Sequence, residues 1–393
     1  MPDRSERVIR FGIIGAGLMG REFASAAARW VHLQQLGARP QVAAVSDIDP
    51  AVLSWYERID PVPRLYADYR DLLADDDVEA VYVAVPHSLH AEVMAAVLRA
   101  GKHLLGEKPF GIDLAACEQI IAVACERPSQ LVRCSSELPF YPGGQWISRW
   151  MAERHAGRVM DATAQFLHSS DLDPRKPSNW KRIAAVNGMY GCMGDLGMHA
   201  LHLPLRLGFT IHNVRAILSN IVIERPDRDG VSIPCDTWDN ATLLCETSLE
   251  DTTFPLWIET KRIAPGETNT WSLQINGTSG SVAYSTKWPK TVRWMEYSPG
   301  KPQAWQYLDL GAESAYPTIT GAIFETGFSD AILQMWAAYL DELVHGRSGM
   351  RQPFYCATPD EALATHRLFT ASLRSHAERS VVALDAGGGA RSW

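Results

Sequence analysis

A glycine pattern near the start of the chain constrains the fold more than any other feature. The sequence Gly-Ala-Gly-Leu-Met-Gly at residues 15–20 directly follows the apolar run Val8–Ile14 and opens a helical stretch, Leu18–Trp30. A predominantly apolar run of this kind is typical of a strand buried on both faces. The first glycine permits a tight turn, the second leaves room for a pyrophosphate, and the third lets the helix pack on the strand. The pattern therefore predicts a dinucleotide held by Gly15, Gly17, Leu18, Met19 and Gly20.

Strands and helices are predicted to alternate over residues 1–137. The further apolar runs are Gln41–Ser46, Ala80–Val85, His103–Gly106 and Leu131–Ser136, and the helical stretches between them are Pro50–Ile59, His87–Arg99 and Asp113–Cys125. This alternation is typical of a doubly wound parallel sheet with helices on both faces. We therefore predict an α/β domain of the Rossmann type over residues 1–137.

The pattern changes after residue 137. Polar and apolar residues alternate in Val159–Leu167, Val214–Ile223, Ala241–Thr247, Leu256–Arg262, Trp271–Ile275 and Thr291–Tyr297. Helical stretches are Gly143–His155, Asp195–Leu207, Gly327–Val344 and Pro359–His376, and residues 276–280 resemble a hairpin turn. These features predict an α+β domain with a mostly antiparallel open sheet over residues 138–385, followed by a flexible tail at 386–393. The second face of such a sheet needs a cover, which a substrate pocket or a partner subunit would supply.

Composition limits the partners and the location that we expect. The chain has 393 residues and a net charge of −8, with acids and bases interspersed, which argues against nucleic acid or an anionic membrane as a partner. No secretory apolar segment and no long apolar span is evident, and the seven cysteines form no CxxC motif. We therefore expect a reduced, cytoplasmic setting.

An acidic residue, Asp47, ends the second predicted strand. A carboxylate at this point can accept hydrogen bonds from the adenine ribose and would repel a 2′-phosphate. It therefore favours NAD over NADP as the cofactor. The alternative role, capping the next helix, suits Asp49 better. Arg58 and Arg64 lie farther along the chain and keep NADP open.

Two further segments identify a family resemblance. Residues 101–109 read Gly-Lys-His-Leu-Leu-Gly-Glu-Lys-Pro, and residues 86–90 read Pro-His-Ser-Leu-His. Together they make the chain resemble the Gfo/Idh/MocA superfamily, whose Glu-Lys-Pro tripeptide is matched by residues 107–109. In that family the lysine faces the nicotinamide and the substrate, so the resemblance gives this role to Lys108; the family usually has Asn in place of His87. It implies cofactor contacts at Pro86, His87, His90, Glu107 and Lys108. Without the resemblance, the same residues would suit a surface Lys–Glu pair.

The sequence Gly-Asp-Leu-Gly-Met-His at residues 194–199 resembles the D-x-G-x-H motif of the same family. Asp195 and His199 are four residues apart, so one helical face can present both to one pocket. An imidazole can take a proton from a sugar hydroxyl as hydride leaves the same carbon, and a carboxylate can orient substrate and imidazole. His202 stands where the family often has Asp. Because no further ligand-rich motif accompanies these residues, we expect no metal.

A loop at residues 169–182 is the third candidate segment. In the family, the equivalent stretch often brings a tryptophan and a charged residue to the substrate, which implies substrate contacts at Trp180 and Lys181. The loop also carries a cationic cluster, Arg175, Lys176, Lys181 and Arg182. The cluster suggests an anionic substrate, or alternatively a solvated loop or a subunit contact. Glu137 and Tyr141, at the domain junction, are further candidate substrate contacts.

The resemblance implies an NAD(P)-dependent oxidoreductase of a sugar, sugar acid or inositol-type polyol. Catalysis would use Lys108, Asp195 and His199, with substrate contacts at these residues, Trp180 and Lys181. The alternative is an NAD-dependent glycoside hydrolase, which oxidises its substrate transiently with resident NAD, eliminates the anomeric group, adds water and returns the hydride. An anionic glycoside such as a sulfoquinovoside or uronide would suit its cationic loop. A non-catalytic cofactor sensor is a third class. Family members often form oligomers, so we expect a homodimer or homotetramer.

Overall fold

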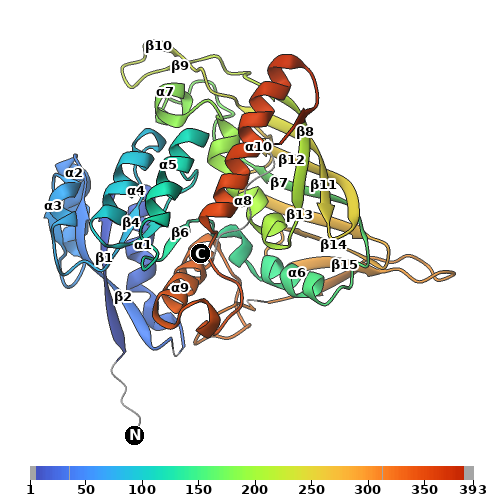
Figure 1. The fold of residues 1–393 in the computed structure, drawn as a ribbon, viewed down its shortest axis with the longest axis horizontal. Coiled ribbons are helices and arrows are strands. Elements are labelled where there is room, and N and C mark those ends of the chain that lie inside the picture. Colours follow the sequence, from blue (N-terminus) through green and yellow to red (C-terminus); the bar gives the residue numbers. More distant parts are fainter. Residues whose placement is uncertain (1–5, 35, 312, 385–393) are drawn as a thin grey trace, which may run out of the picture.

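A computed structural model describes residues 6–34, 36–311 and 313–384 (Figure 1). Its first sheet has six strands in the order β3-β2-β1-β4-β5-β6, and all of its strand pairs are parallel. The strands are β1 (Arg7–Ile14), β2 (Ala38–Ser46), β3 (Arg64–Tyr66), β4 (Ala80–Val83), β5 (His103–Gly106) and β6 (Val132–Cys134). The strand order reverses between β1 and β4, which is where open α/β sheets bind their ligands. The predicted doubly wound sheet is confirmed.

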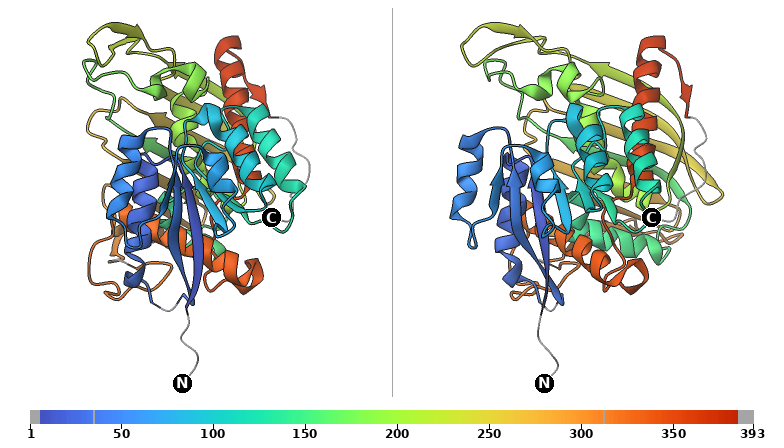
Figure 2. Two further views of the ribbon diagram at one scale, coloured as in Figure 1. Left: turned by 90° about the vertical axis from the view of Figure 1, so that its left-hand side faces the viewer. Right: turned by 60° about the vertical axis from the view of Figure 1, so that its left-hand side comes forward.

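Helices cover both faces of this sheet. On one face lie α4 (His90–Arg99) and α5 (Leu114–Cys125), and on the other α1 (Leu18–Ala28) and α9 (Phe328–His345). Helix α9 lies far beyond residue 137, yet its Trp336 ring packs against Phe11 and Phe23 of the first sheet and its helix. Figure 2 shows α9 beside these strands. The C-terminal part of the chain therefore returns to the first sheet, and the domain bounds at 137 and 385 stay a prediction.

The shortest elements of the first half escaped the sequence analysis. The helix expected over Pro50–Ile59 is two short elements, α2 (Pro50–Leu53) and η2 (Ser54–Arg58). Strand β3 and helix α3 (Tyr69–Leu73) were not predicted, because three to five residues are too few to show a period. The remaining short helices before residue 142 are η1 (Trp30–His32), η3 (His87–Leu89) and η4 (Leu138–Phe140).

The second sheet has nine strands in the order β16-β15-β14-β13-β7-β12-β11-β8-β17. All its pairs are antiparallel except β7 with β12, so the predicted, mostly antiparallel α+β architecture is confirmed. The strands are β7 (Val159–Leu167), β8 (Thr210–Ser219), β11 (Asn240–Leu249), β12 (Thr252–Lys261), β13 (Thr270–Gly277), β14 (Gly280–Ser285), β15 (Thr291–Glu296), β16 (Gln306–Asp309) and β17 (Val382–Ala383). The expected hairpin joins β13 to β14.

Three helices cover one face of the second sheet: α6 (Pro142–Ala152), α8 (Cys192–Arg206) and α10 (Pro359–Glu378). The smaller elements are a two-stranded ribbon, β9 (Glu224–Pro226) with β10 (Ser232–Pro234), and the short helices η5 (Trp180–Arg182), α7 (Ala184–Asn187) and η6 (Arg347–Gly349). The predicted tail at 386–393 lies outside the described residues. No helix among the described residues is long and apolar enough to cross a membrane.

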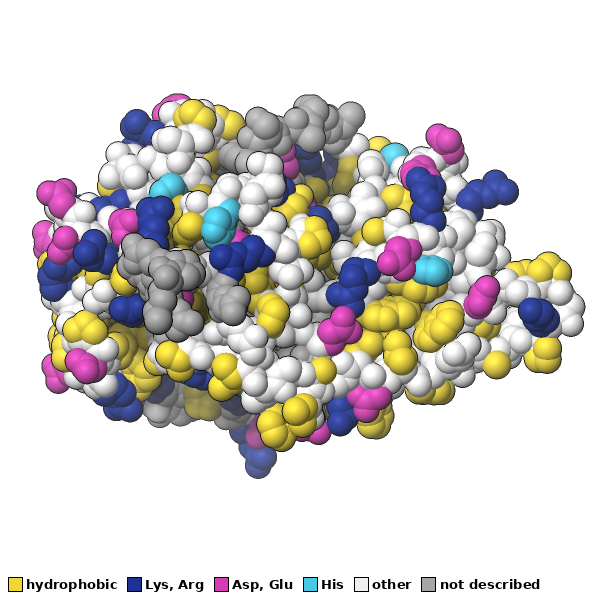
Figure 3. Space-filling view, turned by 90° about the horizontal axis from the view of Figure 1, so that it is seen from below, with side chains coloured by type: hydrophobic (Ala, Val, Ile, Leu, Met, Phe, Trp, Pro, Cys, Tyr) yellow, Lys and Arg dark blue, Asp and Glu magenta, His cyan; other side chains and the backbone are white. Residues whose placement is uncertain are grey.

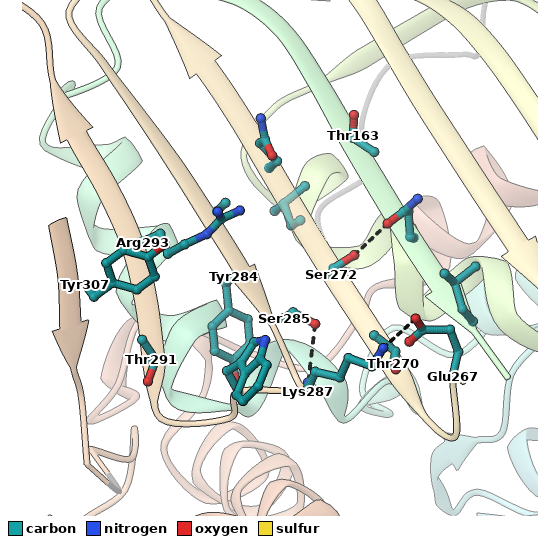
Figure 4. Close-up of a pocket in the computed structure, with 16 residues that line it drawn as sticks. Thr163, Glu267, Thr270, Ser272, Tyr284, Ser285, Lys287, Thr291, Arg293 and Tyr307 are labelled. Atoms are coloured by element: carbon teal, nitrogen blue, oxygen red, sulfur yellow. Dashed lines mark hydrogen bonds and ion pairs between the residues drawn. The ribbon is translucent and has the colours of Figure 1, made fainter. Parts of the chain in front are cut away.

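The other face of the second sheet has no helix packed on it among the described residues. It carries a hollow of about 810 Å³, lined by polar side chains such as Thr163 and Ser272 and by the aromatic rings of Trp288 and Tyr307 (Figure 4). Figure 3 shows a different aspect of the surface, where acidic and basic side chains are interspersed among apolar ones. Alternation along the strands explains the polar lining, because successive side chains point to opposite faces.

Candidate active site

One cavity of about 970 Å³ joins the two halves of the structure. From the first sheet it is lined by the glycine turn, by Asp47, and by the segments that follow β4 and β5. From the second half it is lined by the end of β7 and the residues after it, by Arg262 after β12, by η5 and by α8. Of the predicted site residues, those that line it are Gly15, Gly17, Leu18, Met19, Asp47, Pro86, His87, Glu107, Lys108, Glu137, Trp180, Lys181, Asp195 and His199. Gly20, His90 and Tyr141 do not line it.

The glycine turn has the shape that a dinucleotide requires. A Cβ on Gly17 would meet nothing within 4 Å, so the backbone there is open to the cavity. Gly15 has a φ of +96°, and a Cβ on it would lie 2.4 Å from the Ala84 carbonyl oxygen. Gly20 faces inward, where a Cβ would lie 2.4 Å from the Gly15 carbonyl oxygen. Gly20 therefore serves the packing of helix on strand, while the free N–H groups at the start of α1 face the space for a pyrophosphate.

Asp47 both lines the cavity and supports the glycine turn. Its Oδ2 accepts a hydrogen bond from the Ala16 N–H at 2.8 Å, and its Oδ1 accepts one from the Asp49 N–H at 3.0 Å. Each oxygen has a second lone pair, so the carboxylate can still accept from ribose hydroxyls. Asp49 caps α2 through Ala51, as expected. This lining fits NAD.

The two arginines that left NADP as a possible cofactor, Arg58 and Arg64, do not line the cavity. Arg58 lies over the Trp55 ring, and Arg64 pairs with Asp75. A different arginine, Arg70, lines the cavity but pairs with Asp68 and Glu92.

Lys108 and Asp195 form the polar centre of the cavity. The Lys108 ammonium donates to the Asp195 carbonyl oxygen at 2.7 Å and to its Oδ1 at 3.0 Å. Burial lowers the pKa of Lys108. Lys181 donates to the same Oδ1 at 2.8 Å, and Arg262 donates to Oδ2. One carboxylate thus holds three cations in fixed positions.

Arg262 was missed by the sequence analysis. It directly follows β12, at an end of the second sheet, and lines the cavity. Its guanidinium bridges Asp195 and Asp171, donating from Nε to Asp171 Oδ2 at 2.9 Å. The sequence offered one indication of its role, since Arg262 is a cation at the end of a predicted strand with alternating polar and apolar residues. Its partners, Asp195 and Asp171, come from segments far away in the sequence.

The cationic loop is not a free cluster in the structure. Arg175 pairs with Asp173, and Lys176 pairs with Asp171. Arg182 is buried, and it donates to Asp171 and Asp239. Burial opposes ionisation of Asp171, but the neighbouring Arg262 guanidinium holds the pKa of this carboxyl below its usual range. Of the four loop cations only Lys181 lines the cavity.

His199 lies one turn after Asp195 on α8, yet its neighbours are different groups. Its Nε2 lies 3.8 Å from Glu137 Oε1, and its Nδ1 lies 3.4 Å from the Ser136 hydroxyl. The Phe166 ring meets the imidazole edge to face. Burial and the positive charge of Lys108 hold the pKa of His199 well below its ordinary value. The predicted contact from Asp195 to the imidazole is replaced by one from Glu137, because cations occupy the Asp195 carboxylate.

The remaining predicted residues hold the cavity wall together. His87 bonds through Nδ1 to the Asn187 carbonyl at 2.9 Å, and its ring meets Trp180 edge to face. Glu107 accepts a hydrogen bond from the Tyr82 hydroxyl at 2.6 Å. His90 is buried behind the wall, with one ring nitrogen 2.7 Å from the Pro109 carbonyl oxygen and the other 2.9 Å from that of Val85. His90 therefore fixes the backbone around Lys108 and does not reach the cavity.

Comparison with known proteins agrees with this geometry. Residues 9–133 match the family described as "Oxidoreductase family, NAD-binding Rossmann fold". Levoglucosan dehydrogenase of Pseudarthrobacter phenanthrenivorans is 24% identical over 292 residues, which cover 70% of this chain and 73% of that protein. A dTDP-3,4-didehydro-2,6-dideoxy-alpha-D-glucose 3-reductase of Actinomadura kijaniata is 35% identical over 164 residues, which cover 42% of this chain and 46% of that protein.

Solved structures share the whole fold. The structure of levoglucosan dehydrogenase in complex with NADH superposes with a TM-score of 0.86 at 21% identity, covering 96% of this chain and all of that one. An inositol dehydrogenase homologue of Azotobacter vinelandii, complexed with NAD+, gives 0.79 at 20% identity, covering 98% and 100%. Residues 9–133 thus match the NAD-binding Rossmann domain of the Gfo/Idh/MocA oxidoreductase family, and the glycine turn and the Glu-Lys-Pro segment lie within that match.

Proposed function

We propose that this protein is an NAD-dependent dehydrogenase or reductase of a sugar, a sugar acid or an inositol-type polyol. The observation that carries the proposal is the single cavity that joins the glycine turn to Lys108, Asp195 and His199. Bound NAD would supply the hydride acceptor, or the donor in the reverse direction. The names of the similar proteins, a levoglucosan dehydrogenase, a nucleotide-sugar 3-reductase and an inositol dehydrogenase homologue, support this substrate class.

Each polar residue has a part in this chemistry. The Lys108 ammonium would donate to the reacting oxygen and stabilise its developing negative charge. Asp195, held in turn by Arg262, fixes the ammonium in place, since it accepts from Lys108 at 3.0 Å. His199 is neutral at neutral pH, because its pKa is well below the ordinary value, and so it can accept the hydroxyl proton. Trp180 offers a ring on which a sugar face can stack.

The finer hypothesis of an anionic substrate depends on the cations around Asp195. Lys108, Lys181 and Arg262 surround the single carboxylate of Asp195 at the cavity wall. Asp171 offsets part of the charge of Arg262, but Lys181 has Asp195 as its carboxylate partner and faces the cavity. An acidic group on the substrate would therefore find a charge-assisted donor in Lys181.

A spectrophotometric screen tests the proposed function. Purified protein with NAD is offered neutral sugars, sugar acids, inositols and glycosides, and absorbance of the reduced cofactor is followed. We expect Lys108→Ala and His199→Ala to bind NADH within about threefold of wild type and to lose about 10²–10⁴-fold in kcat, the usual contribution of general acid–base groups. Full turnover in both variants would end the assignment. Release of sugar from a glycoside without accumulation of reduced cofactor would favour the redox-neutral glycosidase instead.

We also propose a homodimer or homotetramer in which a partner subunit covers the open face of the second sheet. Exposed apolar side chains on neighbouring strands support it, among them Ile217, Leu244 and Trp257. Light scattering coupled to size exclusion measures the mass in solution. Leu244→Lys should shift the mass toward the monomer, and a monomeric wild type would contradict the proposal.

A further inference from the structure

Glu137 and His199 face each other across a gap in the cavity wall. Glu137 comes directly before η4, just after the last strand of the first sheet, and His199 lies on α8. The Glu137 Oε1 and His199 Nε2 atoms are 3.8 Å apart, and the two side chains are only 4% and 5% exposed. This distance is too long for a direct hydrogen bond, yet one oxygen atom could lie about 2.8 Å from both atoms at once. A substrate hydroxyl beside these two atoms, on the cavity side, could therefore contact both of them.

The two carboxylates of the cavity centre have different surroundings. Asp195 is held by three cations, which leaves its oxygens poorly placed to receive a proton. Among the described residues, Glu137 makes no ion pair with a lysine or arginine, and its side chain lines the cavity. Of these two groups, Glu137 is the one that is free to bind a proton beside the imidazole.

We propose that Glu137 is a second proton-accepting group of this site, and that Glu137 and His199 together hold the substrate hydroxyl whose proton leaves. The proposal rests on the proposed oxidoreductase function. The sequence analysis expected Asp195, on the same helix as His199, to act beside the imidazole. The proposal instead gives this role to Glu137, at the domain junction.

The proton step balances without any further reactant. In oxidation the carbinol O–H bond breaks, and the proton bonds first to His199 Nε2 and then to Glu137 Oε1. The O–H electron pair becomes the second bond of the carbonyl, and bound NAD would accept the C–H pair as hydride. Glu137 ends as a neutral carboxyl, which must return its proton to solvent before the next turnover. In reduction the same proton travels in the opposite direction.

The electrostatics of the wall favour this order. Burial and the negative charge of Glu107 raise the pKa of Glu137 to about 7, against the opposing influence of its backbone N–H and of Lys108. The pKa of His199 is instead lowered, so a proton passes downhill from imidazole to carboxylate. An acid–base group is most effective when its pKa is near the working pH. The titratable and charged groups around Glu137 are Tyr82, Glu107, Lys108, Tyr141 and His199.

An infrared titration tests the proposal without substrate. In wild type, the carbonyl band of one protonated carboxyl should disappear as the pH rises through about 7. The band should be missing in Glu137→Gln, which keeps the size of the side chain. Glu250→Gln is the matched control, because Glu250 is exposed and pairs with Arg154 on the surface. A wild-type band that persists in Glu137→Gln, or a wild type without the band, would overturn the proposal even if no sugar is turned over.

Kinetics with a substrate from the screen supply the second measurement. Oxidation needs the Glu137 carboxylate, so wild-type kcat/KM should rise with pH through about 7. In Glu137→Gln, this rise of kcat/KM with pH should be absent, and kcat should fall about 10²-fold. The Kd for NADH should stay within about threefold of wild type. An unchanged profile in the variant would count against Glu137 alone. If instead no sugar is oxidised at all but the infrared band behaves as expected, the proposed function is wrong. The assignment of Glu137 as a proton-binding carboxyl would still hold.

Discussion

At the scale of single residues, Lys181 gives the sharpest test of substrate charge. It is the one cation of the 175–182 loop that lines the cavity. Lys181→Ala should reduce kcat/KM for a sugar acid about 10–100-fold and change the value for its neutral analogue less than about threefold, because a charge-assisted hydrogen bond contributes about 1.5–3 kcal/mol. Lys176→Ala is the matched control, since Lys176 pairs with Asp171 outside the cavity lining. Equal losses on both substrates would remove the anionic hypothesis.

The residues near the cavity also show what a sequence can and cannot predict. The i, i+4 spacing correctly placed Asp195 and His199 at one cavity, because it depends only on the geometry of one helix. It could not predict their partners. Arg262 reaches Asp195 from the end of β12, and Glu137 reaches His199 from the end of the first sheet. Such contacts depend on how two sheets pack, and no local pattern encodes that.

At the scale of elements, the glycine turn combines two separate functions. Gly17→Ala should keep the melting temperature within about 1 °C, since a Cβ there meets nothing within 4 Å, but weaken NADH binding at least about tenfold by occupying the space for the pyrophosphate. Gly20→Ala should instead destabilise the fold by about 1–3 kcal/mol, because its Cβ would crowd the Gly15 carbonyl. Calorimetry and NADH fluorescence measure the two effects. Similar losses of stability in both variants would contradict this division.

Helix α9 marks the limit of prediction for whole elements. Its apolar period predicted a helix over Gly327–Val344, and the structure has it at Phe328–His345. Its place on the first sheet was not predicted, since the period identifies an apolar face but not the surface that it covers. The contact is fixed by rings of Phe11 and Phe23 and by the buried ion pair of Arg133 in β6 with Glu342 in α9. Charged partners 209 residues apart leave no local trace in the sequence.

At the scale of the whole molecule, buried histidines should make the fold sensitive to acid. Burial lowers the pKa of His202 and His366 to about 3, and that of His90 to about 4. The unfolded chain binds protons at these residues below about pH 6.5, whereas the folded chain stays neutral there. Stability therefore falls as the pH drops below 6.5, by about 1.4 kcal/mol per pH unit for each such residue until its folded pKa is reached. Acids such as Glu361, whose pKa is lowered to about 2, add to this loss only below about pH 4.5.

His366 allows this effect to be isolated. It is fully buried, neither ring nitrogen has a hydrogen-bond partner among the described residues, and its ring packs against Tyr190. Phenylalanine has a similar shape and no proton to bind, so His366→Phe should remove about 1.4 kcal/mol per pH unit from the decline between pH 6.5 and about 3. Urea unfolding at a series of pH values measures the slope. His212→Phe is the control, since His212 is exposed on β8, with its Nε2 2.7 Å from the Ser248 hydroxyl. If His366→Phe left the slope as steep as in wild type, the loss of stability in acid would have to come from other groups. The inference that His366 stays neutral in the folded protein would then be wrong.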